Sequence, residues 1–210
     1  MSEFDKKAAS WDNDPIRQER SAAVAEGIRK NIPVTGKMRA LEFGAGTGMT
    51  SFLLRDYLGE ITLMDSSREM LKVADEKIRS TDSVNIHTLF HDLASEHYTL
   101  SRFDLVFSQM VLHHITDTAD IISKFHDLLN PGGYLAIVDL YPEDGSFHGE
   151  GFSGHKGFKP VELSALLERS GFENTKHLKC YTISKRTKDS GVLPFDLFLL
   201  VAQRKKDQSL

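Results

Sequence analysis

The sequence predicts an α/β protein with a doubly wound, mostly parallel sheet, helices on both faces and an antiparallel strand at the C-terminal end. Strand-like and helical segments alternate over most of the chain, and a glycine loop follows the first strand-like segment. The last two strand-like segments have no helix between them. Such alternation is typical of βαβ units, which place strands in parallel and cover both faces of the sheet.

Seven elements are predicted before residue 110. The helices have apolar residues at helical spacing, as Met70, Leu71 and Ala74 show, and Ser66 or Ser67 can cap the helix that contains these three. The strands are short apolar runs. In order, the elements are a helix at residues 15–30, a strand at 38–43, a helix at 47–58, a strand at 60–65, a helix at 68–80, and strands at 84–90 and 103–109.

Five further elements are predicted in the second half. The Asn-Pro-Gly-Gly sequence at residues 130–133 breaks a helix before a strand, and Pro160 and Gly171 bracket another helix. The polar connector at 184–191 joins the last two strands, so these should form an antiparallel hairpin. In order, the elements are a helix at residues 117–129, a strand at 134–140, a helix at 160–170, and strands at 173–183 and 195–203.

The composition predicts one soluble, cytoplasmic domain. With 210 residues, 40% of them hydrophobic, the chain can bury one sizeable core. The polar N-terminal stretch lacks a signal-peptide pattern, and no apolar run approaches the roughly 18 residues of a membrane span. The single cysteine, Cys180, excludes an intramolecular disulfide and suggests a reducing compartment. A net charge of −4 argues against nucleic acid as a partner.

The stretch LEFGAGTG, residues 41–48, ends the first predicted strand in a loop with glycines at 44, 46 and 48. Dinucleotide sites use Gly-x-Gly-x-x-Gly, so this loop is one residue tighter and suits a ligand without a pyrophosphate. Glu42 stands at the mouth of the loop, where a carboxylate would repel phosphate and favour an ammonium group. The loop therefore indicates a cationic ligand.

This stretch resembles motif I of the class I S-adenosylmethionine-dependent methyltransferases. Asp65 at the end of the second strand and HDL at 91–93 match the family's next acidic positions. FDLVFSQMVLHHI, from residue 103, and LLNPGGYLAIVD, from residue 128, resemble its later motifs in the same order. The resemblance covers roughly residues 35–140. It implies a Rossmann-like seven-stranded sheet with an antiparallel C-terminal strand, S-adenosyl-L-methionine as the cofactor, and methyl transfer.

The family pattern also implies roles for individual residues. The backbone of the glycine loop would approach the cofactor, and Glu42 would orient its amino-acid end. Asp65 would accept hydrogen bonds from the ribose hydroxyls, and Asp92 would face the adenine amine. The full set of expected cofactor-binding residues is Glu42, Phe43, Gly44, Ala45, Gly46, Asp65, Ser66, Met70, Asp92, Leu93 and Ser108.

Two histidines, His113 and His114, follow the fourth strand, where the reacting methyl group should lie. A neutral histidine is a plausible base for a hydroxyl or an acidic carbon. We expect these two as the catalytic residues; the alternative is that one packs and the other bonds the backbone.

The segment at residues 141–159 is glycine-rich and longer than an ordinary connection. It predicts a substrate lid, with Tyr141, His148 and His155 among the substrate-lining residues. Its carboxylates and histidines could bind a metal, but no compact ligand motif is present, so we expect a solvated loop and no metal.

The N-terminal sequence FDKKAASWD resembles a segment that folds over the cofactor in the small-molecule branch of the family, which includes the ubiquinone and menaquinone biosynthesis methyltransferases. Phe4 and Trp11 would then line a closing cap; the alternative is a disordered tail. The expected single domain thus comprises a cap and helix at 1–31, a cofactor-binding core at 35–140, the lid at 141–159, and a C-terminal helix and hairpin at 160–210.

These features together predict methyl transfer to a small-molecule acceptor by in-line displacement. Two alternatives stay open: a non-catalytic sensor or scaffold that binds the cofactor, and a protein or RNA methyltransferase that needs a partner. Ser108-Gln109-Met110 stands where exocyclic-amine methyltransferases of nucleic acids have a Pro-Pro-aromatic motif, which argues against that function. The sequence does not distinguish oxygen, nitrogen, carbon or sulfur as the acceptor atom, or predict an oligomeric state.

Overall fold

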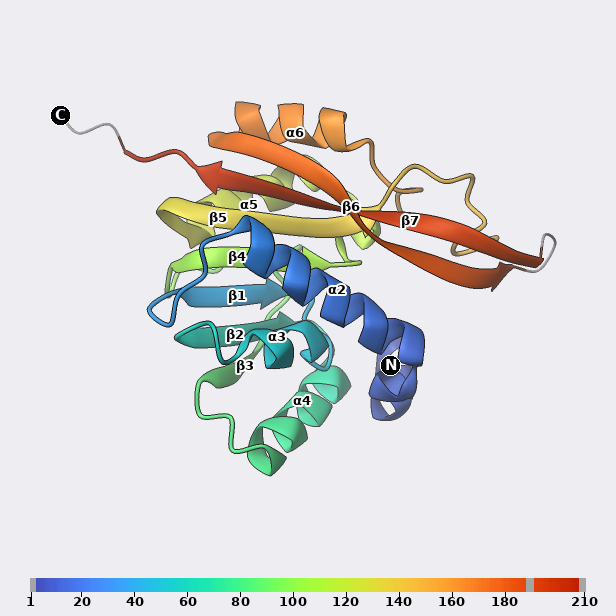
Figure 1. The fold of residues 1–210 in the computed structure, drawn as a ribbon, viewed down its shortest axis with the longest axis horizontal. Coiled ribbons are helices and arrows are strands. Elements are labelled where there is room, and N and C mark those ends of the chain that lie inside the picture. The colour runs from blue at the N-terminus through green and yellow to red at the C-terminus, as the bar shows by residue number, and fades with distance from the viewer. Residues whose placement is uncertain (1–2, 188–190, 208–210) are drawn as a thin grey trace.

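The structure is a computed structural model that describes residues 3–187 and 191–207. Its centre is one seven-stranded sheet in the order β3-β2-β1-β4-β5-β7-β6 (Figure 1). The strands pair in parallel from β3 to β5, and β7 is antiparallel to both of its neighbours. The strands are β1 (Arg39–Phe43), β2 (Glu60–Asp65), β3 (Ile86–Phe90), β4 (Phe103–Gln109), β5 (Leu129–Leu140), β6 (Phe172–Thr187) and β7 (Gly191–Arg204). The predicted fold class is confirmed.

Helices cover both faces of this sheet, as its alternating side chains require. Ala40 of β1 packs in the core cluster under one group of helices, and its neighbour Leu41 packs in the cluster under the other. The first group is α2 (Pro15–Asn31), α3 (Met49–Leu54) and α4 (Arg68–Ser80), and the second is α5 (Thr118–Leu128) and α6 (Pro160–Arg169). Figure 1 shows α2, α3 and α4 together in front of the strands.

Three helices begin with a side-chain cap, of which only the one before α4 was predicted. Asp14, Ser67 and Asp117 each accept a hydrogen bond from a backbone N–H in the first turn of the helix that follows. Of the two serines considered for α4, Ser67 is the cap. These polar residues fix where α2, α4 and α5 begin, and so where the adjoining loops leave the sheet.

Three predicted boundaries were wrong. The helix expected at 47–58 is limited to α3, because Gly48 has a left-handed backbone (φ 76°) and turns follow Leu54. Strand β5 begins at Leu129 and runs through the Asn-Pro-Gly-Gly sequence, where its pairing with β4 shifts register between Phe103 and Leu105. The terminal hairpin is longer than predicted, and residues 188–190 of its expected connector lie outside the described residues.

The N-terminal segment folds over the carboxyl ends of the central strands. It consists of α1 (Glu3–Lys7) and the 3₁₀ helix η1 (Ala8–Asn13). The Ser67 hydroxyl donates to Asp5 at 2.6 Å, and Asp12 pairs with Lys77 of α4 at 2.7 Å and accepts from Thr47. These contacts favour the cap over the alternative of a disordered tail.

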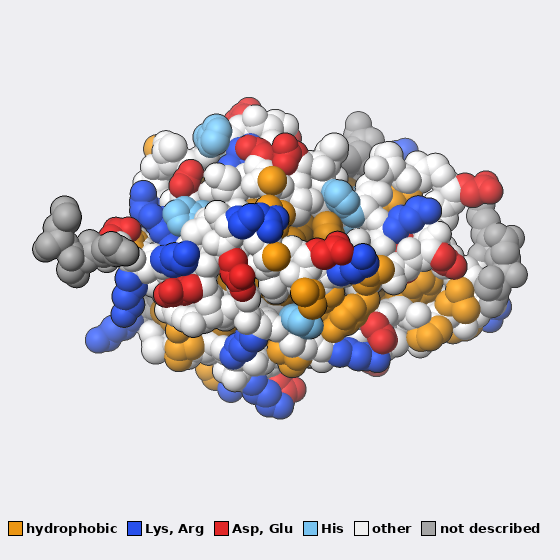
Figure 2. All heavy atoms as spheres, turned by 90° about the horizontal axis from the view of Figure 1, so that it is seen from above, with side chains coloured by type: hydrophobic (Ala, Val, Ile, Leu, Met, Phe, Trp, Pro, Cys, Tyr) orange, Lys and Arg blue, Asp and Glu red, His pale blue; other side chains and the backbone are white. Residues whose placement is uncertain are grey.

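The face in Figure 2 carries basic and acidic side chains intermixed, with hydrophobic side chains exposed between them. Among the helices of the described residues, none is long and apolar enough to cross a lipid bilayer.

Candidate functional site

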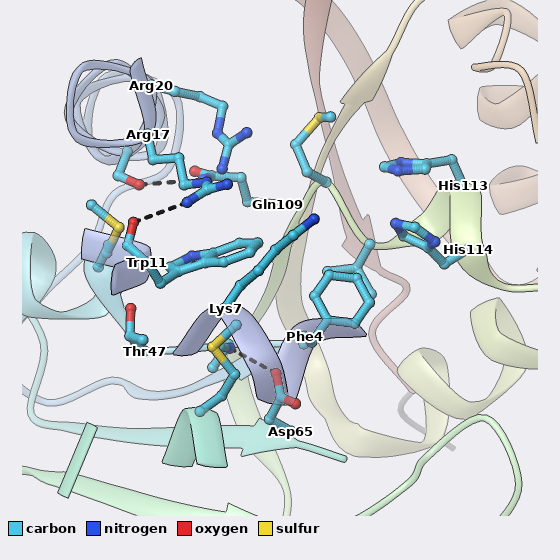
Figure 3. Close-up of a pocket in the computed structure, with 18 of the residues that line it drawn as sticks. Phe4, Lys7, Trp11, Arg17, Arg20, Thr47, Asp65, Gln109, His113 and His114 are labelled. Atoms are coloured by element: carbon cyan, nitrogen blue, oxygen red, sulfur yellow. Dashed lines mark hydrogen bonds between the residues drawn. The ribbon is translucent and has the colours of Figure 1, made fainter. Parts of the chain in front are cut away.

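A cavity of about 810 Å³ lies at the carboxyl edge of the sheet. The N-terminal segment, the glycine loop after β1, the ends of β2 and β4, and the segment after β5 all line it. Figure 3 shows Phe4 and Trp11 of the cap and His113 and His114 after β4 facing the same space. Segments far apart in the sequence therefore enclose one site. The site residues predicted from the sequence that line this cavity are Phe4, Trp11, Glu42, Phe43, Gly44, Ala45, Gly46, Asp65, Ser66, Met70, Asp92, His113, His114 and His148.

The glycine loop turns sharply, with φ values of 65°, 56° and 76° at Gly44, Gly46 and Gly48. A Cβ at Gly44 would lie 2.5 Å from a methyl carbon of Val111. At Gly46 the nearest atoms to such a Cβ lie 3.9 Å away or farther, so the loop backbone is open to the cavity here. Packing requires glycine at position 44, and close approach of a ligand is available at position 46.

Asp65 supports this loop from the end of β2. Its carboxylate accepts the N–H of Gly46 at 2.7 Å and the N–H of Ser67 at 2.7 Å. Burial raises the pKa of Asp65, and these backbone hydrogen bonds partly oppose the shift. Asp65 thus holds the loop in place while it borders the cavity.

Glu42 is buried at the end of β1 and accepts a hydrogen bond from the hydroxyl of Ser51 in α3. Burial raises the pKa of Glu42 to about 7, because a carboxylate loses hydration there, while the Ser51 hydrogen bond acts in the opposite direction. A cation in the cavity would stabilise the ionised form of this group.

His113 lies in the 3₁₀ helix η2 (Leu112–His114) and is only 1% exposed. Its Nδ1 donates to the carboxylate of Asp139 on β5 at 2.7 Å, and its backbone N–H donates to the same carboxylate at 3.2 Å. The Nε2 of His113 is buried and has no hydrogen-bond partner among the described residues. Asp139 therefore fixes the ring and leaves Nε2 available.

The segment after β5 adds His148 to the cavity wall. Its ring stacks on Phe152 at 3.8 Å between centroids, and both side chains line the cavity. Burial, followed by the neighbouring His113 and His114, lowers the pKa of His148 to about 4. The ring of His148 is therefore neutral at physiological pH.

Four predicted site residues do not line the cavity. Leu93 packs in the core of the sheet's other face, and Ser108 is buried within β4, one residue before the strand reaches the cavity at Gln109. The ring of Tyr141 packs on Phe198 of β7 at 5.5 Å. The Nε2 of His155 hydrogen-bonds to the carbonyl of Ile115 at 3.0 Å, which holds the ring away from the cavity.

Residues 41–135 match the family described as a methyltransferase domain. The chain carries an S-adenosylmethionine-dependent methyltransferase domain. The matched residues contain the end of β1, the glycine loop, β2 through β4 and η2, and the glycine loop, Asp65 and the histidines of η2 line the cavity.

Named relatives carry the same kind of domain. An uncharacterized methyltransferase of Schizosaccharomyces pombe is 28% identical over 155 residues, which is 66% of this chain and 55% of that protein. A demethylmenaquinone methyltransferase of Listeria welshimeri is 26% identical over 141 residues, 65% of this chain and 60% of that protein. The chain thus spans somewhat over half the length of these relatives.

Solved structures share the fold. The Haemonchus contortus phosphoethanolamine N-methyltransferase 2, in complex with S-adenosylhomocysteine and its phosphorylated amine, superposes with a TM-score of 0.71 at 16% identity. The superposition covers 90% of this chain and 53% of the other.

The cavity of the methyltransferase domain fits S-adenosylmethionine on two observations. The backbone at Gly46 is open to a ligand. The carboxyl groups of Glu42 and Asp65 face a cavity that would receive a ligand with a sulfonium and an ammonium group. The two carboxyl groups argue against a pyrophosphate, which a carboxylate would repel.

Sequence reasoning missed several cavity residues of the methyltransferase domain. Arg17 and Arg20 of α2 point into the cavity (Figure 3), and the guanidinium of Arg17 stacks 3.8 Å over the ring of Trp11. Burial, and then the charge of Arg17, lower the pKa of Arg20 to about 10. Their i, i+3 spacing near the start of a helix places both on one face, and this spacing was the one feature of the sequence that could have indicated a shared site. Gln109 and Lys7 also line the cavity.

Proposed function

We propose that this chain transfers a methyl group from S-adenosyl-L-methionine to a small-molecule acceptor by in-line displacement. The observation that carries the proposal is one cavity of about 810 Å³ bounded by the glycine loop on one side and by the histidines on the other. An open cavity of this kind favours catalysis over a sensor or scaffold, whose acceptor side would be filled. The name of the Listeria relative, a demethylmenaquinone methyltransferase, also supports a small acceptor.

We assign the donor side to the residues around the glycine loop. The backbone at Gly46 would lie against the cofactor, Glu42 would face its ammonium group, and Asp65 and Asp92 would bind its nucleoside. When bound, the cofactor supplies a methyl group on a positively charged sulfur. The proposed donor-binding residues that line the cavity are Glu42, Phe43, Gly44, Ala45, Gly46, Asp65, Ser66, Met70 and Asp92.

On the acceptor side, His113 and His114 are the proposed catalytic histidines. Methyl transfer needs alignment of the acceptor atom with the methyl and the sulfur, and it often needs removal of a proton from the acceptor. Asp139 acts as a positioning residue, since it fixes the ring of His113 through two hydrogen bonds. The cap and the lid would exclude water from the reacting groups. We place this reaction in the cytoplasm, without a nucleic-acid or membrane partner.

The donor assignment predicts that Asp65→Ala weakens binding of S-adenosylmethionine. The variant removes a proposed hydrogen-bond partner of the cofactor, and it also removes the carboxylate that accepts from the Gly46 N–H and supports the glycine loop. We therefore expect a loss of about 1–3 kcal/mol in binding free energy. Isothermal titration calorimetry measures it, with the exposed Asp56→Ala as control. An unchanged dissociation constant for Asp65→Ala would refute the assignment.

The acceptor assignment is tested by a screen of small quinols, phenols, thiols, amines and carbon acids for formation of S-adenosylhomocysteine. We expect turnover with one class, and loss of turnover without loss of cofactor binding in His114→Ala. Exposed His177 provides the matched control variant, His177→Ala. Tight cofactor binding with no turnover on any class would instead favour the non-catalytic sensor or scaffold. Turnover only after addition of a protein partner would favour the protein or RNA methyltransferase that needs a partner.

A further inference from the structure

Three histidines meet on the acceptor side of the cavity. His113 and His114 come from η2, and His148 comes from the segment after β5, 34 residues farther along the chain. One nitrogen from each ring can be chosen so that all three nitrogens lie within 4.8 Å of one another. The ring centroids are 4.3, 4.9 and 5.3 Å apart. These rings therefore converge on a common point.

Two of these nitrogens are buried without a hydrogen-bond partner among the described residues: Nε2 of His113 and Nε2 of His148. Leaving a buried polar atom unpaired is costly, and such atoms in native proteins usually have a partner. The ring of His113 is 1% exposed, so bulk water does not surround it. A ligand that accepts lone pairs from both rings would satisfy them.

Asp139 adds an independent observation. Its carboxylate accepts the Nδ1–H of His113 at 2.7 Å and is itself fully buried. A carboxylate behind a histidine is the usual arrangement in metal sites, where it fixes the ring and directs the other nitrogen to the ion.

We propose that His113, His114 and His148 bind one divalent transition-metal ion, with zinc as the best match. Imidazole nitrogen is a preferred ligand of zinc, and catalytic zinc sites use three protein ligands and leave a fourth position open. The aromatic rings of Phe152 and Phe4 lie beside these histidines and form an apolar surround. No sequence motif signals the site, because its ligands come from two separate segments.

The role of this ion rests on the proposed function. Within that function the ion would activate the acceptor. Its open position would face the cavity and bind an oxygen or sulfur of the acceptor. A bound hydroxyl or thiol loses its proton to solvent more readily than a free one. Its lone pair then forms the bond to the methyl carbon while the carbon–sulfur bond of the cofactor breaks. The site thus favours an acceptor that ionises at oxygen or sulfur.

The test is zinc binding by the full chain after dialysis against a chelator, measured by calorimetry with zinc chloride alone. We expect one zinc ion per chain, and at least a tenfold weaker affinity in His148→Ala and in His114→Ala. Asp139→Asn should weaken binding by 10- to 100-fold as a positioning residue. His177→Ala provides the matched control and should bind as the parent does. Cobalt in place of zinc should give the visible absorption of a four-coordinate ion.

Circular dichroism and binding of S-adenosylmethionine confirm that each variant is folded. The proposal is overturned if the parent binds no zinc, or if His148→Ala and His177→Ala bind it equally, which would indicate surface binding. Zinc affinity needs no acceptor, so this result is separate from the turnover screen: turnover without zinc binding would refute the metal site and leave the methyltransferase proposal standing.

Discussion

Glu42 connects the chemistry of the cavity to the pH of the solution. Its carboxyl group is buried at the end of β1 and its pKa is raised to about 7, chiefly by burial. Between the ordinary carboxyl pKa and this value the folded protein holds a proton that the unfolded chain releases. The folded state is therefore favoured at the acidic end of this window.

This linkage predicts that the contribution of Glu42 to the stability of the cofactor-free protein falls as pH rises from about 4.5 to about 7, while the lowered pKa of His148 acts in the opposite direction over much of the same range. Glu42 alone can change the free energy of unfolding by at most about 3 kcal/mol, the energy that corresponds to a rise of its pKa to about 7. Urea unfolding at pH 5 and pH 8 measures the free energy of unfolding, and Glu42→Gln, which cannot ionise, should be less destabilised than the parent on going from pH 5 to pH 8. An equal pH dependence in the parent and the variant would show that Glu42 does not titrate in this range.

At the scale of elements, polar contacts to α4 and to the glycine loop hold the N-terminal cap over the cavity. The ion pair between Asp12 and Lys77 is partly exposed, with side-chain exposures of 31% and 27%, and such pairs contribute little to stability. The same contact holds η1 beside the glycine loop, because Asp12 also accepts from Thr47 and Lys77 donates to the Thr47 carbonyl. The cap should therefore matter more for binding than for folding.

We expect Asp12→Ala to weaken S-adenosylmethionine binding by about tenfold, or 1.4 kcal/mol, while lowering the free energy of unfolding by under about 1 kcal/mol. Trp11 is the single tryptophan of the chain and lines the cavity, so its fluorescence reports both cap position and cofactor binding. Lys30, whose ion pair with Glu26 lies on the exposed side of α2, supplies the control Lys30→Ala. Equal losses of affinity and stability in Asp12→Ala would contradict the cap.

The proposed lid makes a close backbone contact with His113 at Gly154. A Cβ at this position would lie 2.3 Å from the carbonyl oxygen of His113, and the next N–H, of His155, donates to that same oxygen at 2.7 Å. Gly154→Ala should push the lid away from His113. We expect lower turnover with cofactor affinity retained, measured by S-adenosylhomocysteine formation and calorimetry.

Gly36→Ala is the matched control for this change, since a Cβ at Gly36 meets no atom within 4 Å among the described residues. If Gly154→Ala turned over as fast as Gly36→Ala, the lid contact would have no part in the reaction.

The order of the elements could be predicted because each carries a local signal. Apolar periodicity located all seven strands, and Ser67 and Asp117 marked helix starts. Element lengths could not be predicted from local signals: β5 continues through Pro131, between its pair with β4 at Leu129 and its pairs with β4 and β7 from Tyr134 onward.

At the scale of the whole molecule, the site is built where distant segments meet. The motif residues Gly46, Asp65 and Asp92 were predictable because parallel strands bring their carboxyl ends to one edge. Asp139 and Arg20 could not be predicted. Asp139 gains its role from its contact with His113, and Arg20 reaches the cavity from helix α2. His148 was predicted to line the substrate, but its meeting with His113 and His114 appears only in the folded chain.

Because the proposed cofactor site joins the N-terminal segment to the sheet, a bound cofactor should stabilise the whole fold. At a free concentration 100 times its dissociation constant, S-adenosylmethionine should add about 2.7 kcal/mol. For a chain of this length that corresponds to a rise in Tm of about 5–10 °C. Differential scanning fluorimetry measures the rise, and Asp65→Ala should require higher concentrations for the same shift. A Tm independent of the cofactor would contradict binding at this site.

The position of β7 also affects the order in which this sheet can form during synthesis. β7 follows β6 in the chain, yet it lies between β5 and β6 and is the only neighbour of β6 among the described strands. Until residues 191–204 emerge, β5 has an unpaired edge and the nascent chain exposes a template for aggregation. A premature stop codon before β7 would therefore yield an insoluble chain, even though every residue of the proposed donor site would already have been translated.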